Sequence, residues 1–317
     1  MSRIDAHHHV RRPAPSPSAT HGPAPSPGPG PRRRVHAWLD APGTAPVRRD
    51  FTLEDLAPPG QAAGVDRTIL VQVLPDTGET EDFLTLASTA GTVAGVVRWV
   101  DLPSDRLPRT LDTLRAAPGG ELLVGTRHLV QDERDPRWLS RPDVRRGLRL
   151  VARADLAYDL LVRPHQLPAA IEAVRELPEL TFVLDHPAEP PVATGEMQPW
   201  TSLVRELAAL LNAFCKLSGM ATEAGRNRWS VATLRPCADV VLDAFGPERV
   251  MFGSDWPVCL PAASHEEVVG AAEALTDGLT EAERSHVFRA TAERAYRLEE
   301  RHRRGRADDA EAVEAVR

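Results

Sequence analysis

The sequence lacks long apolar runs, paired cysteines and an export signal, and each absence excludes a class of protein. No run approaches the roughly 18 to 20 apolar residues that a membrane-spanning helix needs. The three cysteines have no C-x-x-C spacing, which argues against a disulfide framework and for a reducing compartment. The first ten residues, MSRIDAHHHV, have no apolar core of the kind that a secretory signal needs. We therefore expect a cytoplasmic protein with no membrane partner.

Positive charge is also scarce, and lysine is nearly missing. The formal net charge of −7 removes the general electrostatic case for nucleic acid, because contacts to phosphates need a basic face. Lysine occurs once, at Lys216, among 38 basic residues, so almost all of them are arginine. This bias, together with the many prolines and alanines, is typical of a GC-rich coding sequence. Most arginines therefore need no functional explanation, and we interpret Lys216 as structural or peripheral.

Two segments differ in composition from the rest of the chain. Residues 11–34 are dense in Pro, Gly and Ser and cannot bury enough apolar surface to order themselves, which predicts a flexible insertion. Residues 301–317 are charged and are expected to form a frayed tail. The chain up to residue 300 is then long enough for one barrel domain that carries the insertion.

The rest of the chain alternates short apolar runs with longer amphipathic segments such as 141–155 and 167–177. Buried strands without polar alternation, separated by helices, are typical of a parallel sheet covered by helices. Eight such units predict a closed (β/α)₈ barrel. The rival is a doubly wound open sheet, which would need a Gly-rich turn after its first strand, and no G-x-G-x-x-G occurs there. The eight predicted strand segments are RIDAHHH (3–9), DRTILVQV (66–73), AGVVRWVDL (94–102), ELLVGTRHL (121–129), AYDLLVRPH (157–165), LTFVLDHP (180–187), AFCKLSGM (213–220) and ERVMFGSDWP (248–257).

Several of these runs end in imidazole or carboxylate side chains, at the edge where barrel active sites form. Side chains alternate along a strand, so His7 and His9 share one face while His8 points the other way. If that face is the barrel mouth, His165 and Asp255 can complete a set of three nitrogens and one oxygen. Such a set, with an open position for water, is expected of catalytic zinc or a related divalent metal. Taken alone, Asp255 in its Gly-Ser-Asp-Trp-Pro context would also suit a plain turn.

At these positions the chain resembles the amidohydrolase superfamily, in its amidohydrolase-related branch, and within that branch the L-fuconolactonase and L-rhamnonolactonase type of sugar-lactone hydrolase. The resemblance covers nearly the whole chain in order. GSDWPVC after a strand, with CKLSG earlier, is quite specific to this branch. The segments that carry it are IDAHHH (4–9), RRDFTLEDLAP (48–58), AAGVDRTILVQ (62–72), GTRHLVQDE (125–133), DPRWLSRPDVRRGL (135–148), YDLLVRPHQLP (158–168), FVLDHPAEPP (182–191), CKLSGMATEA (215–224) and MFGSDWPVC (251–259).

The resemblance implies roles for matching residues. His7, His9 and His165 match the metal-ligating histidines, and His186 matches the histidine that contacts substrate or water. Asp255 matches the aspartate that is both ligand and general base. Many relatives bridge two metals with a fourth-strand lysine or glutamate, and this strand instead ends in Arg127-His128. We therefore expect one divalent ion, zinc by preference, although some related lactonases are thought to work without a metal.

The substrate-binding side chains expected from the chemistry are two aromatic and two basic residues. Trp38 and Trp256 could stack on a sugar ring, and Arg127 and His128 could bind polar substrate groups. As a catalytic residue beside Asp255, His186, or else Arg127, could stabilise the developing oxyanion together with the metal. The chain departs from the family where Val10 replaces an aromatic residue, where the Pro-rich insertion precedes Trp38, and where Ala188-Glu189 replaces Gly-Lys. These departures bear on the identity of the sugar.

The leading prediction is therefore hydrolysis of a sugar lactone to the aldonic acid by activated water. Two alternatives stay open at this stage. One is a non-oxidative decarboxylase of the amino-carboxymuconate-semialdehyde decarboxylase type, and the other is a barrel without catalytic activity that acts as a binding protein. The expected partner is a small-molecule substrate, and self-association into a homo-oligomer is compatible with the sequence.

Overall fold

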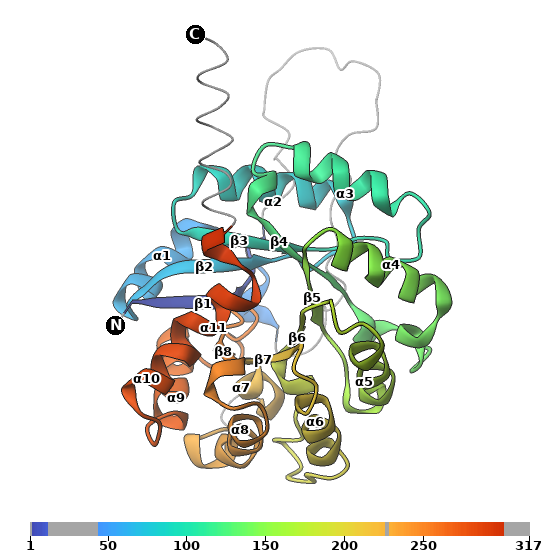
Figure 1. The fold of residues 1–317 in the computed structure, drawn as a ribbon. Coiled ribbons are helices and arrows are strands. Elements are labelled where there is room, and N and C mark those ends of the chain that lie inside the picture. The colour runs from blue at the N-terminus through green and yellow to red at the C-terminus, as the bar shows by residue number, and fades with distance from the viewer. Residues whose placement is uncertain (1, 12–43, 226–227, 301–317) are drawn as a thin grey trace.

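A computed structural model of the protein describes residues 2–11, 44–225 and 228–300. Eight parallel strands follow one another in chain order around a single sheet, and helices lie outside it (Figure 1). This confirms the predicted (β/α)₈ barrel, because each of the eight predicted segments overlaps one strand. The strands are β1 (Arg3–His8), β2 (Val65–Val71), β3 (Val93–Arg98), β4 (Leu123–His128), β5 (Ala157–Leu160), β6 (Phe182–Leu184), β7 (Ala213–Leu217) and β8 (Val250–Phe252).

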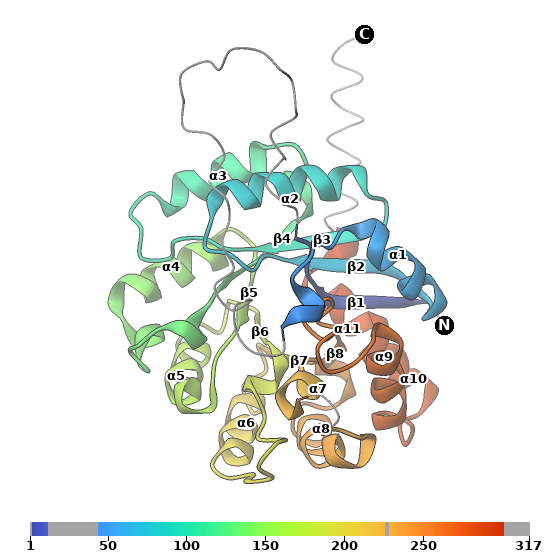
Figure 2. The same ribbon diagram turned by 180° about the vertical axis from the view of Figure 1, so that it is seen from behind.

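The helices surround the strands, as the views from both sides show (Figures 1 and 2). None of the helices in the described ranges is long and apolar enough to cross a membrane. Every connection from one strand to the next contains one or two of them. They are α1 (Leu53–Ala62), α2 (Thr77–Thr89), α3 (Leu107–Ala116), α4 (Pro142–Arg153), α5 (Leu167–Glu176), α6 (Trp200–Ala208), α7 (Met220–Ala224), α8 (Val231–Phe245), α9 (His265–Leu275), α10 (Glu281–Ser285) and α11 (Thr291–Ala295).

Local sequence explains where several helices begin. Thr52, Ser230, Ser264 and Thr280 precede α1, α8, α9 and α10, and each side chain accepts a hydrogen bond from the backbone N–H three residues later. Such caps satisfy backbone donors that have no partner inside the helix. Pro142 occupies the first position of α4, where its missing N–H costs nothing.

The barrel interior is apolar at the end where the strands begin. The C-terminal helix α11 and the residues after it close this end, and Tyr296 is fully buried there. A charged layer lies nearer the carboxyl ends of the strands, and it is described with the site below. The apolar layer consists of Ile4, Ala6, Ile69, Val71, Ala94, Val97, Val124, Ala157, Val183, Phe214, Met251, Ala292, Ala295, Tyr296 and Leu298.

The ring closes between β1 and the residues that follow β8. His8 pairs with Trp256 in a parallel bridge. The Asp255 N–H donates to the His7 carbonyl at 2.8 Å, and the His9 N–H donates to the Trp256 carbonyl at 2.7 Å. The closing contacts therefore run directly beside the predicted site residues.

The fold departs from the sequence prediction at the fifth strand. The apolar run 157–165 predicts a strand that reaches His165, whereas β5 ends at Leu160 and a 3₁₀ turn occupies Pro164–Gln166. Proline has no N–H to donate to a neighbouring strand and restricts the residue before it, so the ladder stops short of it. The predicted tail 301–317, and all of the predicted insertion except Arg11, lie outside the described residues.

Candidate active site

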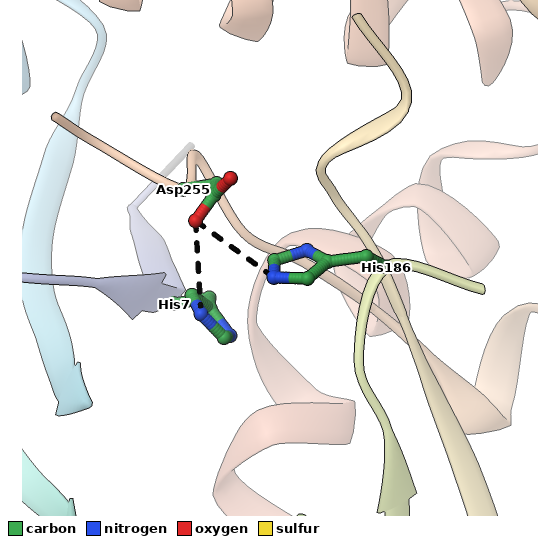
Figure 3. Close-up of side chains that lie close together, drawn as sticks. All are labelled: His7, His186 and Asp255. Carbon is green, nitrogen blue, oxygen red and sulfur yellow. Dashed lines mark ion pairs between the residues drawn. The ribbon is translucent and has the colours of Figure 1, made fainter. Parts of the chain in front are cut away.

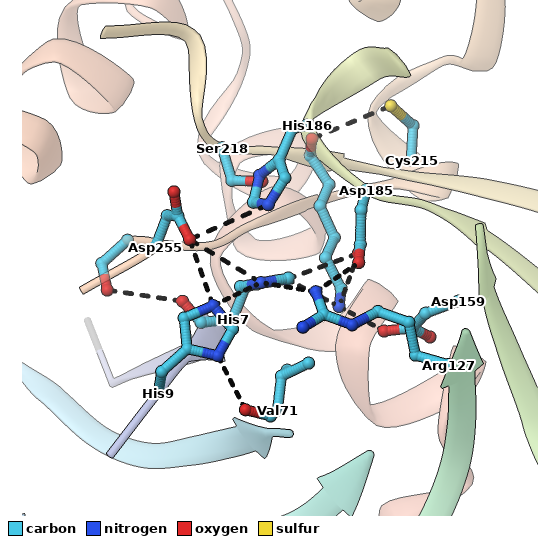
Figure 4. Close-up of polar contacts among 12 residues, drawn as sticks. His7, His9, Val71, Arg127, Asp159, Asp185, His186, Cys215, Ser218 and Asp255 are labelled. Carbon is cyan, nitrogen blue, oxygen red and sulfur yellow. Dashed lines mark hydrogen bonds and ion pairs between the residues drawn. The ribbon is translucent and has the colours of Figure 1, made fainter. Parts of the chain in front are cut away.

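Four side-chain atoms converge at the carboxyl ends of β1, β6 and β8. The Nε2 atoms of His7 and His9 lie 3.3 Å apart, and His9 Nε2 lies 3.3 Å from Asp255 Oδ1. The same oxygen lies 3.8 Å from His7 Nε2 and 3.8 Å from His186 Nε2. Figure 3 shows His7, His186 and Asp255 pointing toward one another, and Figure 4 adds His9 and the surrounding polar contacts. We call these four residues the histidine–aspartate cluster.

An irregularity in β1 aims its two histidines into the barrel. Between Asp5 and His8, β1 contains one more residue than the paired part of β2. An extra residue of this kind is a bulge, which changes the face on which the following side chains lie. His7 and His9 therefore point inward together, while His8 faces away and contacts Thr68 Oγ1 at 2.9 Å.

Asp255 lies in the loop that follows β8, in an unusual backbone conformation. Its φ is +56°, in the left-handed region that non-glycine residues rarely adopt. The hydrogen bond from its N–H to the His7 carbonyl holds it against β1. The preceding residue, Ser254, donates hydrogen bonds from its N–H and its hydroxyl to the Asp5 carboxylate. A backbone conformation of this kind is kept only where many surrounding contacts hold it in place, and such positions are common at functional sites.

The outer nitrogens of two cluster imidazoles have partners that orient the rings. His9 Nδ1 lies 2.7 Å from the Val71 carbonyl oxygen, and His186 Nδ1 lies 2.9 Å from Ser218 Oγ. Because a carbonyl oxygen only accepts hydrogen bonds, His9 carries its proton on Nδ1 and presents the Nε2 lone pair to the cluster. Ligating histidines are typically fixed by outer partners of this kind.

Burial sets the protonation states of the cluster. Removal from water lowers the pKa of His9 to about 3 and also lowers the pKa values of His7 and His186. Burial raises the pKa of Asp255 to about 6. At neutral pH the cluster therefore consists of three neutral imidazoles and a carboxylate that is mostly ionised.

This donor set fits a divalent cation. His7, His186 and Asp255 offer ligand atoms that all lie within 4.8 Å of one another. A tetrahedral zinc site with bonds of about 2.0 to 2.1 Å has ligand atoms about 3.3 Å apart, close to the 3.3 to 3.8 Å that separates the four donor pairs described above. Neutral imidazoles and a carboxylate are also the ligand types that zinc binds in catalytic sites. His7, His186 and Asp255 are therefore the residues that could hold the ion together, and His9 Nε2 lies beside them, 3.3 Å from His7 Nε2 and from Asp255 Oδ1.

A buried network of charges lies directly beneath the cluster. Lys216 Nζ lies 2.5 Å from Asp159 Oδ2, 2.9 Å from Asp185 Oδ1 and 3.1 Å from His7 Nδ1. Arg127 Nη1 lies 3.1 Å from Asp185 Oδ2 and 3.4 Å from His7 Nε2. Burial acts to raise the pKa of the Asp185 carboxyl, but Lys216, His7 and Arg127 hold it well below its usual range. The two carboxylates thus balance the two cations around His7. Figure 4 shows Arg127, Asp159 and Asp185 beside this ring.

His165 is the predicted ligand that the structure does not bring to the cluster. It is exposed in the 3₁₀ turn Pro164–Gln166, beyond the end of β5. The third imidazole beside Asp255 belongs to His186, for which the resemblance implied contact with substrate or water. The structure therefore brings together His7, His9 and Asp255 of the predicted set, adds His186, and leaves His165 at the surface.

His128 lies apart from the cluster. Its Nδ1 accepts a hydrogen bond from Trp99 Nε1 at 3.2 Å, and its Nε2 donates to Glu133 Oε1 at 2.7 Å. The ring also stacks on Trp138, with centroids 4.2 Å apart and planes 9° apart. Both ring nitrogens of His128 thus have protein partners, so the geometry gives no support to its predicted contact with substrate.

The other predicted substrate contacts are placed as follows. The Arg127 guanidinium is buried, and its Nη2 donates to the Gln72 carbonyl at 2.6 Å. Trp256 is only 3% exposed and packs edge-on against Phe51, with ring centroids 5.2 Å apart, which leaves little of its face for a sugar. Trp38 lies outside the described residues.

Sequence reasoning gave no functional role to Lys216, Asp159 or Asp185, which form the charged layer. One signal was available for Lys216. It is the sole lysine of the chain, and it stands inside an apolar run that is too buried for an unpaired charge. Asp159 stands in a similar apolar run, on β5.

Fold and site together define the class: a (β/α)₈ barrel with histidines on its first strand and an aspartate after its last. The model of the amidohydrolase family matches residues 4–298, and the chain belongs to that family.

The chain is 38% identical to the L-fucono-1,5-lactonase of Burkholderia multivorans over 280 residues, which cover 85% of this chain and 93% of that protein. It is 40% identical to the enzyme of that name from Burkholderia ambifaria over 212 residues, covering 67% and 72% of the two chains. A crystal structure of an amidohydrolase from Burkholderia multivorans with bound zinc superposes with a TM-score of 0.81 at 34% identity, covering 94% of this chain and all of the other.

Proposed function

We propose that this chain opens a sugar lactone to the corresponding aldonic acid, with water as the nucleophile. The observation that carries the proposal is the convergence of three imidazole nitrogens on one oxygen of Asp255 at the mouth of the barrel. The similarity to proteins named L-fucono-1,5-lactonase supports the choice of substrate class.

Asp255 is the general base in this proposal. Its carboxylate is buried among neutral imidazoles, and its pKa of about 6 leaves it largely ionised at neutral pH while still able to bind a proton. It takes the proton of the attacking water as the new C–O bond forms. It then passes this proton to the ring oxygen, which leaves the carbonyl carbon as a hydroxyl group when the lactone opens.

The histidines of the cluster, with Asp255, are proposed to hold one divalent ion, with zinc as the first candidate. Such an ion supplies positive charge that stabilises a developing oxyanion and makes water more acidic. His9 and His186 present Nε2 toward Asp255 because Val71 and Ser218 engage their other nitrogens. Arg127 contributes through its charge, since its guanidinium is already bound to Asp185 and to the Gln72 carbonyl.

Polar side chains near the cluster suit a substrate rich in hydroxyl groups. Glu189 follows His186 and forms an ion pair with Arg163 at 3.6 Å. Glu223, in α7, lies close enough to Glu189 and Asp255 that their charges, added to burial, raise its pKa to about 7. Carboxylates of this kind can accept hydrogen bonds from sugar hydroxyls.

We also propose a cytoplasmic protein, which the three free, buried cysteines support.

A panel of lactones tests the proposal. The purified protein is mixed with fucono-, rhamnono- and galactono-lactones and a dicarboxylic pyrone in weak buffer, and a pH indicator follows acid release with and without a chelator. We expect at least one sugar lactone to open enzymatically. Release of carbon dioxide from a carboxylated substrate, with no lactone opened, would support the decarboxylase alternative instead. Neither alternative predicted from the sequence is favoured by an observation at this site.

A further inference from the structure

The only lysine of the chain lies against a proposed metal ligand. Lys216 is fully buried in β7, and its ammonium group donates to Asp159 Oδ2 at 2.5 Å. Tyr296 donates its hydroxyl to the same carboxylate at 2.9 Å to each oxygen, which fixes the position of Asp159. The Lys216 ammonium is therefore held in place from below and faces His7 Nδ1 at 3.1 Å.

The geometry indicates where the Lys216 hydrogens point. An ammonium group has three donors and no acceptor. The contacts with Asp159 and with His7 Nδ1 are aligned as hydrogen bonds. The 2.9 Å contact with Asp185 is an ion pair only, because Asp185 Oδ1 has no aligned hydrogen-bond donor among the described residues. Lys216 thus donates to His7, and one oxygen of Asp185 is left without a hydrogen bond.

This hydrogen bond conflicts with metal binding by His7. If Nδ1 accepts from Lys216, the single proton of neutral His7 lies on Nε2, where it can be donated to the lone pair of His9 Nε2 at 3.3 Å. The contact of Arg127 Nη1 with His7 Nε2 would need the opposite arrangement, and at 3.4 Å it is the longest of the three. A histidine that binds a metal through Nε2 must instead carry its proton on Nδ1. Asp185 Oδ1 lies 3.3 Å from His7 Nδ1. It can accept a hydrogen bond from an Nδ1–H group once Lys216 no longer donates to Nδ1.

We propose that Lys216 is a positioning residue that acts through His7 and weakens the binding of a divalent cation by the histidine–aspartate cluster. The inference rests on the cation site of the proposed function. Without a cation, Lys216 holds His7 with its proton on Nε2. Binding of the ion requires the proton to move to Nδ1 and the hydrogen bond to pass from Lys216 to Asp185.

Charge acts in the same direction as the hydrogen bond. Lys216 and Arg127 both lie within 3.4 Å of His7, one beside each ring nitrogen. A divalent ion at Nε2 must approach both of these cations in a buried region, where the repulsion is weakly screened. Removal of the Lys216 charge should therefore strengthen cation binding, whereas a purely structural lysine would leave it unchanged or weaken it.

The first test compares Lys216→Met/Asp159→Asn with Asp159→Asn alone. The double variant removes one charge of each sign, so that no buried carboxylate loses its only cation. The single variant controls for loss of Asp159. Zinc affinity is measured by competition with a fluorescent chelator on metal-stripped protein. We expect the double variant to bind zinc at least tenfold more tightly than Asp159→Asn, and equal or weaker binding would overturn the proposal.

The second test needs no variant of the charged layer. In metal-free wild-type protein labelled with ¹⁵N, the imidazole shifts report which nitrogen of His7 carries the proton, and His7→Gln identifies the signals. We expect the proton on Nε2 without zinc and on Nδ1 with zinc. A proton on Nδ1 in the metal-free protein would overturn the proposal. Because neither readout uses a lactone, zinc binding without lactone opening refutes the proposed function alone. Absence of zinc binding in every protein refutes the cation site and this inference together.

Discussion

The Asp5 carboxylate accepts two hydrogen bonds from Ser254, one from its backbone N–H at 2.8 Å and one from its hydroxyl at 2.5 Å. Asp5 belongs to β1 and Ser254 directly precedes Asp255, so this pair joins the first strand to the loop that carries the proposed base. The Asp5 carboxylate also accepts from the His7 N–H at 3.1 Å. One buried side chain therefore holds both His7 and Asp255 in place.

Substitution of Ser254 by alanine tests this connection. The change leaves Asp5 Oδ2 buried without its short hydrogen bond, which should lower the free energy of unfolding by about 1–3 kcal/mol. It should also lower kcat more than it raises KM, because Asp255 is displaced while the mouth keeps its shape. Ser202→Ala, at an exposed position in α6, is the matched control and should change neither quantity. Equal behaviour of the two variants in thermal melting and kinetics would show that the pair does not position the loop.

A pair of histidine variants separates the cation site that the geometry supports from the one predicted by sequence. His186→Ala removes an imidazole beside Asp255, whereas His165→Ala removes an exposed one. Loss of a residue that hydrogen-bonds to a metal ligand typically weakens metal binding by about 10–100-fold. His186 is proposed as a ligand itself, so we expect His186→Ala to weaken zinc binding by at least this much. His165→Ala should bind zinc as the wild type does. The opposite order, measured by elemental analysis after dialysis and by competition with a chelator, would restore His165 as the ligand.

The raised pKa of Glu223 predicts a stability effect that depends on pH. Burial, followed by the negative charges of Glu189 and Asp255, raises this pKa from its usual 4.5 to about 7. The folded protein therefore binds this proton more tightly than the unfolded chain, so the group costs stability increasingly as pH rises from 4.5 to 7, and fully above 7. Glu223→Gln should stabilise the protein by about 1–3 kcal/mol at pH 8, and much less at pH 4.5. Glu281→Gln, at the exposed start of α10, serves as the control. A gain in melting temperature that is the same at both pH values would contradict the assignment.

The barrel could be predicted from sequence because its strands are short apolar runs separated by amphipathic helices. Burial on both faces leaves little polar alternation in a parallel strand, so each of the eight runs was visible. The inward orientation of His7 and His9 depended on more than alternation. The bulge that turns them toward the mouth arises from the register between β1 and β2, which a single sequence does not report.

The differences between the predicted site and the observed geometry have equally specific causes. His165 was predicted as a ligand because its apolar run looks like a strand up to that residue, whereas β5 ends at Leu160 and His165 lies exposed in the turn that begins at Pro164. The charged layer of Lys216, Asp159 and Asp185 was missed because its members lie far apart in the sequence, on β7, on β5 and directly after β6. Only the closed ring brings them within hydrogen-bond distance. A solitary lysine inside an apolar run was the one trace of this layer in the sequence.

The central claim is that Asp255 acts as the base in opening a sugar lactone, and one comparison tests it most directly. The initial rate of acid release from L-fucono-1,5-lactone is measured for the wild type and for Asp255→Asn, with circular dichroism to confirm that both are folded. Loss of a general base typically costs about 10²–10⁴-fold, so we predict a fall in kcat of at least about 100-fold with the fold retained. A folded Asp255→Asn protein that opens the lactone at the wild-type rate would contradict the account.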